Sequence, residues 1–318
     1  MKIGIVGNGG IVLSALNSLR GCGIPYTALW CRNAEKGKPL CEEYDIENLY
    51  TDYDAFLKDD SYDTVYIGLI NSLHYQYSKQ ALLAGKHVIC EKPLTGTYEE
   101  AADLVRTAKE QGVFLFEAIM LRYSPNYEKI AESLPEIGDI KLVISNYSQY
   151  SRRFDDYQNG KVLPAFDPKL YGGALYDINV YNIHTVTGLF GKPESFEYYA
   201  NRGFNGVDTS GVLMMDYGTF KAVCTGAKDS ESDSFTMIQG TKGYIKVPGR
   251  PGIVKNVVLS LHEGKTVSLD VSEETDPMGT EFLRMEKVMN ENDRKTAEEW
   301  LAKSLFTMEI LAEAGKSK

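Results

Sequence analysis

Short apolar runs alternate with amphipathic segments along the chain up to about residue 120. A short β-branched run predicts a buried strand, whereas apolar residues that recur every three or four positions predict a helix. Because strands that are separated by helices pair in parallel through long crossovers, the alternation predicts a doubly wound α/β domain. The predicted strands are 2–6, 27–31, 64–70, 87–90 and 113–116, and the predicted helices are 11–19, 75–84 and one that runs from a Thr97-x-x-Glu100 capping box to Gly112.

Beyond residue 120 the pattern changes to closely spaced apolar runs, several of them joined by tight turns such as 216–218 and 241–243. Such turns join neighbouring strands into hairpins, so this half predicts a large, open and mostly antiparallel sheet. The predicted domains are therefore 1–120 and 121–318. The predicted strands here are 140–150, 195–201, 212–217, 220–226, 235–239, 244–247, 254–261 and 266–271, and the predicted helices are one that starts at Ser124-Pro125, 174–190, 279–290 and 295–314.

The composition is that of a globular protein, with 43% hydrophobic and 25% charged residues, and a length of 318 residues favours two domains. A net charge of −10 would repel DNA and anionic membranes, so neither is an expected partner. No apolar run reaches the ~20 residues of a membrane span, and the chain starts without the apolar stretch of a signal peptide. The five cysteines are scattered, and no cluster has the spacing of metal ligands. We therefore expect a cytoplasmic protein without a disulfide framework and without a bound metal.

A glycine-rich turn follows the first predicted strand and opens the first predicted helix. Its spacing, Gly7-x-Gly9-x-x-Val12, is that of a dinucleotide-binding loop, in which backbone amides at a helix N-terminus approach the pyrophosphate. The third position usually holds glycine or alanine, so Val12 departs from the pattern, and an ordinary glycine turn is the alternative. The residues expected to contact the cofactor are Gly7, Asn8, Gly9, Gly10 and Ile11.

The end of the second predicted strand indicates which dinucleotide binds. An acid there would bind the ribose 2′-hydroxyl of NAD, but the sequence reads Trp30-Cys31-Arg32-Asn33. Because an arginine can pair with the 2′-phosphate of NADP, we expect Arg32 and Asn33 to bind the cofactor and NADP to be preferred over NAD. An ordinary solvated charge is the alternative for Arg32.

Three further segments identify a family. The first reads NSLH at 71–74 and AGKHVICEKP at 84–93, the second has Glu-Ala at 117–118 followed by Arg122, and the third reads GGALYDINVY at 172–181. Together with the glycine loop they resemble the glucose–fructose oxidoreductase/inositol dehydrogenase (Gfo/Idh/MocA) family over nearly the whole chain. The resemblance implies a Rossmann domain followed by an α/β domain whose antiparallel sheet forms the interface of a homodimer or homotetramer. It also implies hydride transfer between a nicotinamide and a carbinol or carbonyl carbon of a sugar, polyol or dihydrodiol.

The resemblance assigns the chemistry to three side chains. Lys92 matches the family's catalytic lysine, which would hydrogen-bond the reacting oxygen and stabilise its charge, and the Lys92–Pro93 bond is often cis in this family. The family motif D-x-x-x-H corresponds to Asp177 and Tyr181, so a tyrosine replaces the histidine that acts as acid and base. The dihydrodiol and xylose dehydrogenase branch shares this tyrosine, and a lysine cation would favour the phenolate. Tyr181 stands four positions after Asp177, hence both lie on one helix face, and a packed core tyrosine is the alternative.

The other candidates have supporting roles in this resemblance. Asn71, His74 and Glu91 are expected at the nicotinamide end of the cofactor. Arg122 and His184 are expected to contact the substrate, with an ordinary ion pair and a packed core histidine as their alternatives. For the whole protein, the alternative is a non-catalytic NAD(P)-binding sensor on the same fold, which would need no acid–base residue.

Overall fold

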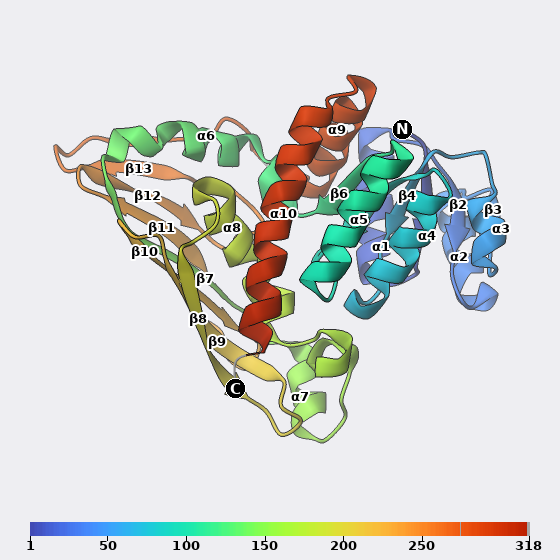
Figure 1. Cartoon of the computed structure of the whole chain (residues 1–318), viewed down its shortest axis with the longest axis horizontal. Coiled ribbons are helices and arrows are strands. Elements are labelled where there is room, and N and C mark those ends of the chain that lie inside the picture. Colours follow the sequence, from blue (N-terminus) through green and yellow to red (C-terminus); the bar gives the residue numbers. More distant parts are fainter. Residues whose placement is uncertain (274, 317–318) are drawn as a thin grey trace. The chain divides into compact units, whose positions relative to one another are not determined.

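The computed structural model of the protein describes residues 1–273 and 275–316 (Figure 1). The contacts between Cα atoms divide the chain into two compact units, each of which is described by itself. The first unit consists of 1–118 and 278–305, and the second consists of 119–277 and the residues from 306 onward. The sequence had suggested a single boundary near residue 120, with both C-terminal helices in the second domain.

A six-stranded parallel sheet forms the centre of the first unit. Its strand order, β3-β2-β1-β4-β5-β6, is that of a dinucleotide-binding Rossmann fold, which confirms the predicted doubly wound domain. The strands β1, β4 and β6 are buried along their whole length, as expected for a parallel sheet that is covered on both faces. The sequence did not predict β3, because its three half-buried residues form no recognisable apolar run. The strands are β1 (Ile3–Val6), β2 (Tyr26–Trp30), β3 (Asn48–Tyr50), β4 (Thr64–Ile67), β5 (His87–Glu91) and β6 (Leu115–Ala118).

Local signals set the ends of the helices around this sheet. Thr97 and Glu100 form the predicted capping box at the start of α5, and Gly112 ends that helix with a φ of 68°. Gly23 ends α1 in the same left-handed conformation. In Figure 1, α4 and α5 lie side by side. The helical segments are α1 (Gly10–Cys22), α2 (Ala34–Tyr44), α3 (Tyr53–Leu57), η1 (Asn71–Leu73), α4 (His74–Leu83) and α5 (Tyr98–Gln111).

Two helices from the end of the chain contribute to the first unit. The ring of Phe282 on α9 meets the ring of Tyr66 edge-on, with 5.7 Å between the ring centroids. The guanidinium of Arg294, at the start of α10, lies 3.7 Å from the ring centroid of Phe114. These contacts join segments that are far apart in the sequence, so the pattern of apolar positions could not assign α9 to a domain. The two helices are α9 (Pro277–Asn290) and α10 (Arg294–Gly315).

An eight-stranded sheet forms the second unit, in the order β14-β13-β12-β11-β7-β10-β9-β8. Its neighbouring strands are antiparallel except β7 and β10, which run parallel at the centre. The prediction of a mostly antiparallel sheet is confirmed, and the parallel pair arises because β10 returns to β7 from a distant part of the chain. The strands are β7 (Ile140–Ser148), β8 (Ser195–Arg202), β9 (Asp208–Asp216), β10 (Lys221–Ala227), β11 (Phe235–Gly240), β12 (Gly243–Pro248), β13 (Val258–Leu261) and β14 (Thr266–Ser268).

The segment 174–190, predicted as one helix, lies against this sheet in two parts. A π-helical turn, η6 (Leu175–Asn179), leads into α8 (Val180–Phe190), which lies over β7 and β10 (Figure 1). Two buried amide side chains attach it to carbonyl oxygens of β10: Asn179 Nδ2 donates over 3.3 Å and Asn182 Nδ2 over 2.8 Å. Because π-helical turns are frequent at functional sites, this departure from a regular helix makes η6 a candidate part of the functional site.

Shorter helical segments complete the second unit. Ser124 caps α6 as predicted, since its side chain accepts hydrogen bonds from the amides of Asn126 and Tyr127, and Pro125 occupies the first helical position. The segments are η2 (Met120–Tyr123), α6 (Pro125–Ser133), η3 (Leu134–Ile137), α7 (Arg152–Gln158), η4 (Pro164–Phe166) and η5 (Pro168–Leu170).

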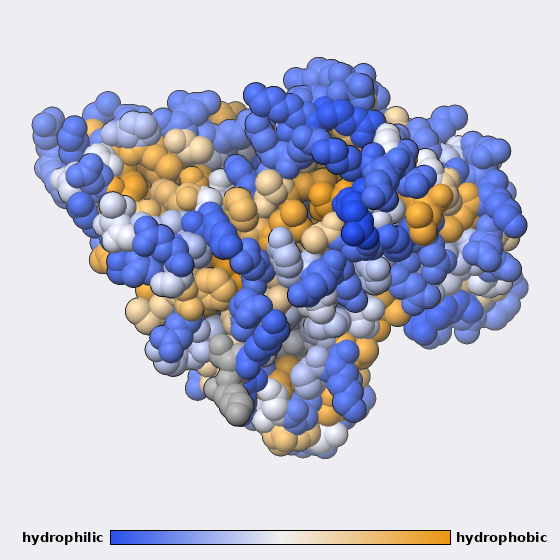
Figure 2. Space-filling model, in the orientation of Figure 1, coloured by the Kyte–Doolittle hydropathy of each residue, from blue (hydrophilic) through white to orange (hydrophobic). Residues whose placement is uncertain are grey.

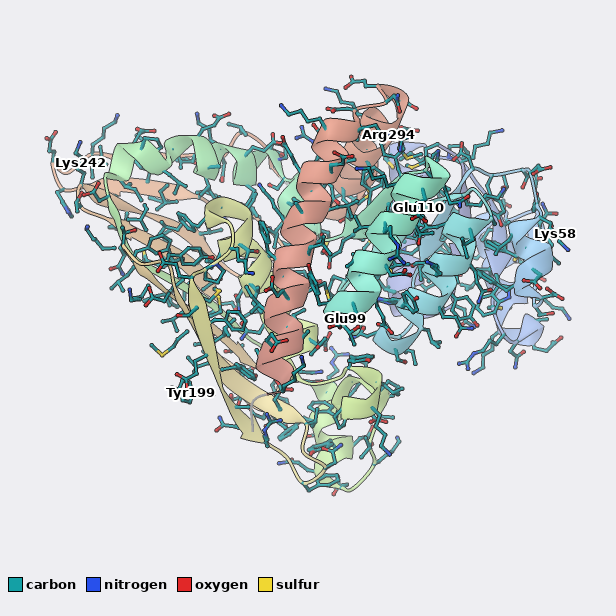
Figure 3. The ribbon with its side chains drawn as sticks, in the orientation of Figure 1. Lys58, Glu99, Glu110, Tyr199, Lys242 and Arg294 are labelled. Atoms are coloured by element: carbon teal, nitrogen blue, oxygen red, sulfur yellow. The ribbon has the colours of Figure 1, made fainter. Side chains whose placement is uncertain are left out.

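Hydrophilic side chains predominate on the face of the molecule shown in Figure 2. Glu99 and Glu110, labelled in Figure 3, are exposed on α5. No helix among the described residues is both long enough and apolar enough to cross a membrane. All five cysteines are free thiols, and residues 1–273 and 275–316 contain no group of three or more His, Cys, Asp or Glu side chains that could hold a metal ion.

Candidate active site

The glycine loop lies where β1 ends and α1 begins. Gly7 has a φ of 115°, and a Cβ atom there would lie 2.5 Å from the carbonyl oxygen of Gly68, so only glycine fits. A Cβ atom at Gly9 or Gly10 would meet no other atom within 4 Å. The start of α1, which carries a partial positive charge, therefore has open space beside Gly9 and Gly10, as a bound pyrophosphate requires. The exposed residues of the loop are Asn8, Gly9, Gly10 and Ile11.

Val12, which departs from the dinucleotide pattern, is fully buried. A Cβ atom at Gly68, just after β4, would lie only 2.7 Å from Val12 Cγ2. The missing side chain at position 68 therefore provides the room that glycine or alanine at position 12 provides in the usual loop. As a result, α1 approaches the sheet closely despite the larger residue.

Arg32 and Asn33 follow the end of β2. Arg32 is exposed, and no acid stands at this strand end to repel a 2′-phosphate. The side-chain oxygen of Asn33 accepts a hydrogen bond from the amide of Glu35 over 2.9 Å, so Asn33 caps α2. A second helix N-terminus thus begins beside Arg32, which favours an anion at this position. Cofactor contact by Arg32 and Asn33 stays a prediction.

His74 is fully buried at the start of α4 and touches two backbone carbonyl groups. Its Nδ1 lies 2.8 Å from the oxygen of Pro93, and its Nε2 lies 3.1 Å from the oxygen of Leu69. Burial is the main cause that lowers the pKa of this imidazole. His74 therefore ties the loop after β4 to the loop after β5, which fits a supporting role. Asn71 is half-buried and opens η1, just before His74.

Lys92 directly follows β5, and the Lys92–Pro93 peptide bond is cis, as the resemblance suggested. The next amide, that of Leu94, donates to Glu117 Oε1 over 3.0 Å. This hydrogen bond and the contact of His74 Nδ1 with the carbonyl oxygen of Pro93 fix the backbone that follows Lys92. The side chain of Lys92 itself is half-exposed and accessible. The sequence assigned no role to Glu117, although an acid inside the buried strand β6 is a signal that could have identified it.

Glu91 precedes Lys92 and is buried at the end of β5. Its Oε1 accepts a hydrogen bond from the hydroxyl of Tyr66 over 2.7 Å. Burial raises the pKa of the Glu91 carboxyl, while the Tyr66 hydrogen bond and the charge of Lys92 act in the opposite direction. Glu91 is therefore placed to hold the strand end that carries Lys92, and a contact with the cofactor stays a prediction.

In the second unit, Asp177 lies in η6 and Tyr181 in the first turn of α8. Asp177 Oδ2 lies 2.8 Å from Nζ of Lys228, whose side chain is 2% exposed, whereas the side chain of Asp177 is 38% exposed. The same ammonium donates to the carbonyl oxygen of Ala165 over 2.6 Å. Lys228 belongs to none of the motifs recognised in the sequence, although a lone lysine directly after the apolar strand β10 is an informative signal.

The ring of Tyr181 is held between an aromatic ring and a stretch of backbone. Tyr147 on β7 lies nearly perpendicular to it, with 5.8 Å between the ring centroids. A Cβ atom at Gly252 would lie 3.2 Å from Tyr181 Cε1, so the backbone there approaches the ring closely. These contacts restrict the ring of a half-exposed tyrosine, as an acid–base residue requires.

Arg122 and His184 form a buried pair in the second unit, 5% and 0% exposed. A guanidinium nitrogen of Arg122 donates to His184 Nδ1 over 2.8 Å, and the Thr307 hydroxyl lies 3.2 Å from the same nitrogen. Because Nδ1 accepts from Arg122, the imidazole is neutral with its proton on Nε2. The structure thus brings these two predicted site residues together, and a contact of either with substrate stays a prediction.

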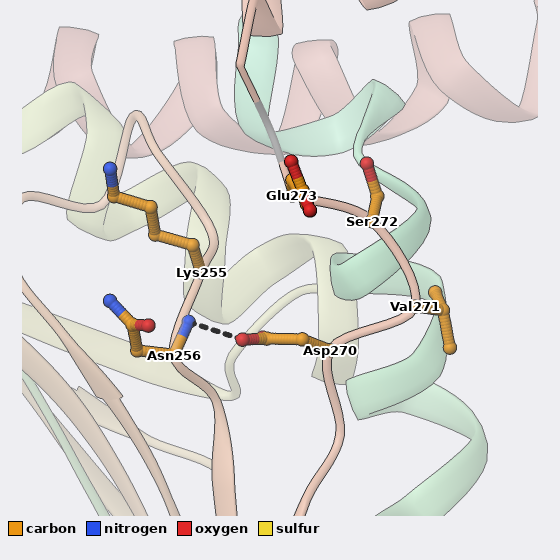
Figure 4. A pocket seen from close by; sticks show the side chains of 6 residues that line it. All are labelled: Lys255, Asn256, Asp270, Val271, Ser272 and Glu273. Carbon is orange, nitrogen blue, oxygen red and sulfur yellow. Dashed lines mark hydrogen bonds between the residues drawn. The ribbon is translucent and has the colours of Figure 1, made fainter.

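A shallow pocket elsewhere in the second unit contains none of the predicted site residues (Figure 4). The carboxylate of Asp270 at its edge accepts hydrogen bonds from the amides of Asn256, over 2.7 Å, and Val257, over 2.9 Å. Its polar groups therefore stabilise the loop, and we assign no function to it. The lining residues are Lys255, Asn256, Asp270, Val271, Ser272 and Glu273.

Known proteins resemble the chain along most of its length. It is 31% identical over 292 residues to the scyllo-inositol 2-dehydrogenase (NADP(+)) of Bacillus subtilis, covering 91% of this chain and 88% of that one. It is 31% identical over 269 residues to the trans-1,2-dihydrobenzene-1,2-diol dehydrogenase of Xenopus tropicalis, covering 83% and 78%. The fold matches the 3-ketoreductase KijD10 of Actinomadura kijaniata, solved with TDP-benzene and NADP, with a TM-score of 0.83, 23% identity and coverage of 99% and 96%.

Two family models match the chain in succession. Residues 1–119 match the model of the oxidoreductase family with an NAD-binding Rossmann fold, and 134–246 match the Gfo/Idh/MocA C-terminal domain. The first match covers the parallel sheet with the glycine loop and Lys92, and the second covers η6, α8 and most of the second sheet. The chain therefore belongs to the Gfo/Idh/MocA family of oxidoreductases, as the motifs in its sequence had indicated.

Proposed function

We propose that this oxidoreductase transfers a hydride between NADP and a CH–OH carbon of a polyol, sugar or dihydrodiol. The observation that carries the proposal is the loop after β5, which His74 and Glu117 hold in place and which leaves Lys92 accessible. Inositol and dihydrodiol dehydrogenases among the relatives support this class of substrate.

Oxidation of an alcohol requires a proton to leave the oxygen as hydride leaves the carbon. In the proposed mechanism, Tyr181 takes this proton as general base and returns it as general acid in the reverse direction. The ammonium of Lys92 donates to the reacting oxygen and stabilises its developing negative charge. Asp177 accepts a hydrogen bond from a neighbouring hydroxyl of the substrate and so orients the carbon that reacts.

The residues of the first unit fit the dinucleotide. Open space over Gly9 and Gly10 at the start of α1 admits a pyrophosphate, and exposed Arg32 beside the start of α2 suits a 2′-phosphate. When bound, NADP supplies the nicotinamide carbon that accepts or donates the hydride. The NADP named for the Bacillus subtilis relative supports NADP over NAD here.

A panel of polyols, sugars and dihydrodiols, assayed with NADP and with NAD by the absorbance of the reduced cofactor, tests this proposal. With the best substrate, Lys92→Ala should abolish turnover and leave the dissociation constant of NADP within a few-fold of the wild-type value. Near-full turnover by this variant would refute the role of Lys92. Tight binding of NADP without turnover on any substrate would favour the sensor instead.

We also propose that two or four copies of the chain assemble through the outer face of the eight-stranded sheet. Large apolar side chains are exposed there on β7, β8, β9 and β12, and the register places them all on one face. An apolar face of this kind marks an interface, and a second copy would bury it symmetrically. Light scattering tests the oligomer, and a monomer mass would refute it. The residues are Leu142, Tyr199, Val212, Met214 and Tyr244.

The compartment proposed for the enzyme is the cytoplasm. All five cysteines are free thiols, among them half-buried Cys22 and Cys41, which suits a reducing compartment. Fractionation of cells followed by detection of the protein tests this location, and its recovery outside the cytoplasmic fraction would refute it.

A further inference from the structure

Lys228 presents a buried cation to a partly exposed carboxylate. It follows β10 directly, and the residue as a whole is 1% exposed. Its ammonium lies 2.8 Å from Asp177 Oδ2, donates to the oxygen of Ala165 over 2.6 Å and lies 4.4 Å from the ring centroid of Phe166. Of the three N–H donors of an ammonium, two can therefore be satisfied by Asp177 and Ala165, and the ring of Phe166 lies beside the charge. The position of the Asp177 carboxylate is therefore coupled to a side chain that has little freedom to move.

The backbone around Lys228 is equally constrained. Its amide donates to the oxygen of Thr209 over 2.8 Å, which continues the pairing of β10 with β9. Its carbonyl accepts from the amide of Ser151 over 2.9 Å, at the start of the segment that carries α7 and η4. Phe166, under the ammonium, is fully buried and packs with Tyr157. Lys228 thus connects three parts of the second unit: the eight-stranded sheet, the segment that starts at residue 151, and η6.

The choice of partner distinguishes Lys228 from an ordinary structural lysine. The charge of Lys228 also acts on Asp208, which is 8% exposed and whose carboxylate accepts hydrogen bonds from the amide of Leu175 and the hydroxyl of Tyr198. The ammonium pairs instead with Asp177, which solvent reaches. A buried charge that needed only neutralisation would be satisfied by a buried partner. The pair therefore leaves a fixed anion at the surface of the second unit.

We propose that Lys228 is a positioning residue that holds the carboxylate of Asp177, ionised and in one orientation, to accept a hydrogen bond from a hydroxyl of the substrate. This inference rests on the proposed function, in which Asp177 binds a hydroxyl next to the reacting carbon. Acid–base chemistry is not assigned to Lys228, because its buried ammonium is engaged with Asp177, Ala165 and the ring of Phe166. Its effect on catalysis passes through Asp177 alone.

A double-mutant cycle tests this assignment on the full chain with NADP and the best substrate of the panel. Lys228→Met keeps the length of the side chain and removes the charge, and Asp177→Asn removes the charge of its partner. We expect K228M to lower kcat/KM by roughly 10- to 100-fold, the size of one charge-assisted hydrogen bond. In the D177N background, K228M should lower it by less than about 3-fold, because the partner is already lost. The dissociation constant of NADP should not change.

Lys86 in the first unit provides a matched control. It is also buried, donates to the carbonyl oxygens of Asp59 and Tyr62, and lies 4.6 Å from the ring centroid of Tyr62. Lys86→Met should lower the free energy of unfolding as K228M does, but should leave kcat/KM unchanged in the folded enzyme. Should K228M fail to fold, Lys228→Gln, which keeps a donor for Ala165 without the charge, replaces it in the cycle.

Each outcome of the cycle has a definite meaning. A wild-type value of kcat/KM in the folded K228M or K228Q variant would overturn the positioning role. So would a loss of kcat/KM on adding K228M to D177N that equals the loss on adding it to the wild type. An equal loss of kcat/KM in K86M would assign the effect to stability and overturn it as well. Absence of turnover by the wild-type enzyme on the whole panel would refute the proposed function and this inference together. Turnover by the wild-type enzyme that K228M leaves unchanged would refute this inference alone, so the two failures are distinguishable.

Discussion

The contact between Val12 and Gly68 gives a prediction whose size follows from the structure. A Cβ atom at Gly68 would lie 2.7 Å from Val12 Cγ2, 3.1 Å from Tyr66 Cε1 and 3.4 Å from Ile11 Cγ2. Gly68 does not have a left-handed backbone conformation, so alanine would cause no backbone strain there. Gly68→Ala therefore perturbs side-chain packing alone, most of all the packing of Val12 on α1 against the sheet and to a lesser degree that of the Tyr66 ring.

The expected magnitudes come from the groups that are added and removed. Gly68→Ala adds a methyl group to a filled space and should lower the free energy of unfolding by about 1–3 kcal/mol. Val12→Ala removes two buried methyl groups and should lower it by about 2 kcal/mol, including the cavity that remains. In the double variant, the new methyl group takes space that Val12 has vacated. The combined loss should therefore be smaller than the sum of the two losses by about 1 kcal/mol or more.

Denaturant unfolding of the wild type, both single variants and the double variant measures these losses, provided that the m-values agree. The dissociation constant of NADP, followed by protein fluorescence, gives a second readout. Displacement of α1 by the added methyl group should weaken NADP binding in G68A, and binding should recover in the double variant. Strictly additive losses of unfolding free energy would refute the view that Gly68 compensates for Val12.

Three further predictions concern single side chains. Arg32→Ser should raise the dissociation constant of NADP roughly tenfold and leave that of NAD unchanged, and equal changes for both cofactors in a titration would contradict it. Glu117→Leu leaves the buried amide of Leu94 without an acceptor, so the free energy of unfolding should fall by about 1–3 kcal/mol and kcat should fall with it; a normal kcat in steady-state assays would count against this role. Burial lowers the pKa of His74 in the folded protein. The stability that the neutral, buried imidazole contributes is therefore complete above the ordinary histidine pKa of 6.5. It is lost as the pH falls below that value, because His74 then binds a proton in the unfolded chain but not in the folded protein. His74→Gln should flatten the decrease in unfolding free energy between about pH 7 and 5, while His87, whose pKa is also lowered by burial, keeps its own share; an unchanged slope would disprove the assignment.

The features that were predictable from the sequence involve residues that are close in the chain. Thr97 and Glu100 satisfy each other's amides within one helical turn, and Ser124 caps a helix that Pro125 begins. Gly7 needs its positive φ because of the turn that it occupies. In each case a few neighbouring residues determine the local conformation, so the sequence contains the whole signal.

The features that were not predictable depend on which distant segments meet. The strand β3 has too few residues to show a pattern, and it exists because it pairs with β2. The parallel pairing of β7 with β10 follows the path of the chain between them, which hairpin signals do not describe. The attachment of α9 to the first unit depends on the packing of the Phe282 ring against the ring of Tyr66. Apolar patterns state that a residue is buried, but not what it is buried against.

The same distinction applies to the candidate site. By itself, the sequence determined the family, the Rossmann fold, and the types of side chain available for hydride transfer, because motifs at fixed spacing carry that information. Only the tertiary structure decided that Lys228 pairs with Asp177, that Glu117 holds the amide after Pro93, and that Gly68 makes room for Val12. Each of these contacts joins segments that are far apart along the chain. Because the groups are buried, an unpaired polar group or an overfilled space there would lower the free energy of unfolding.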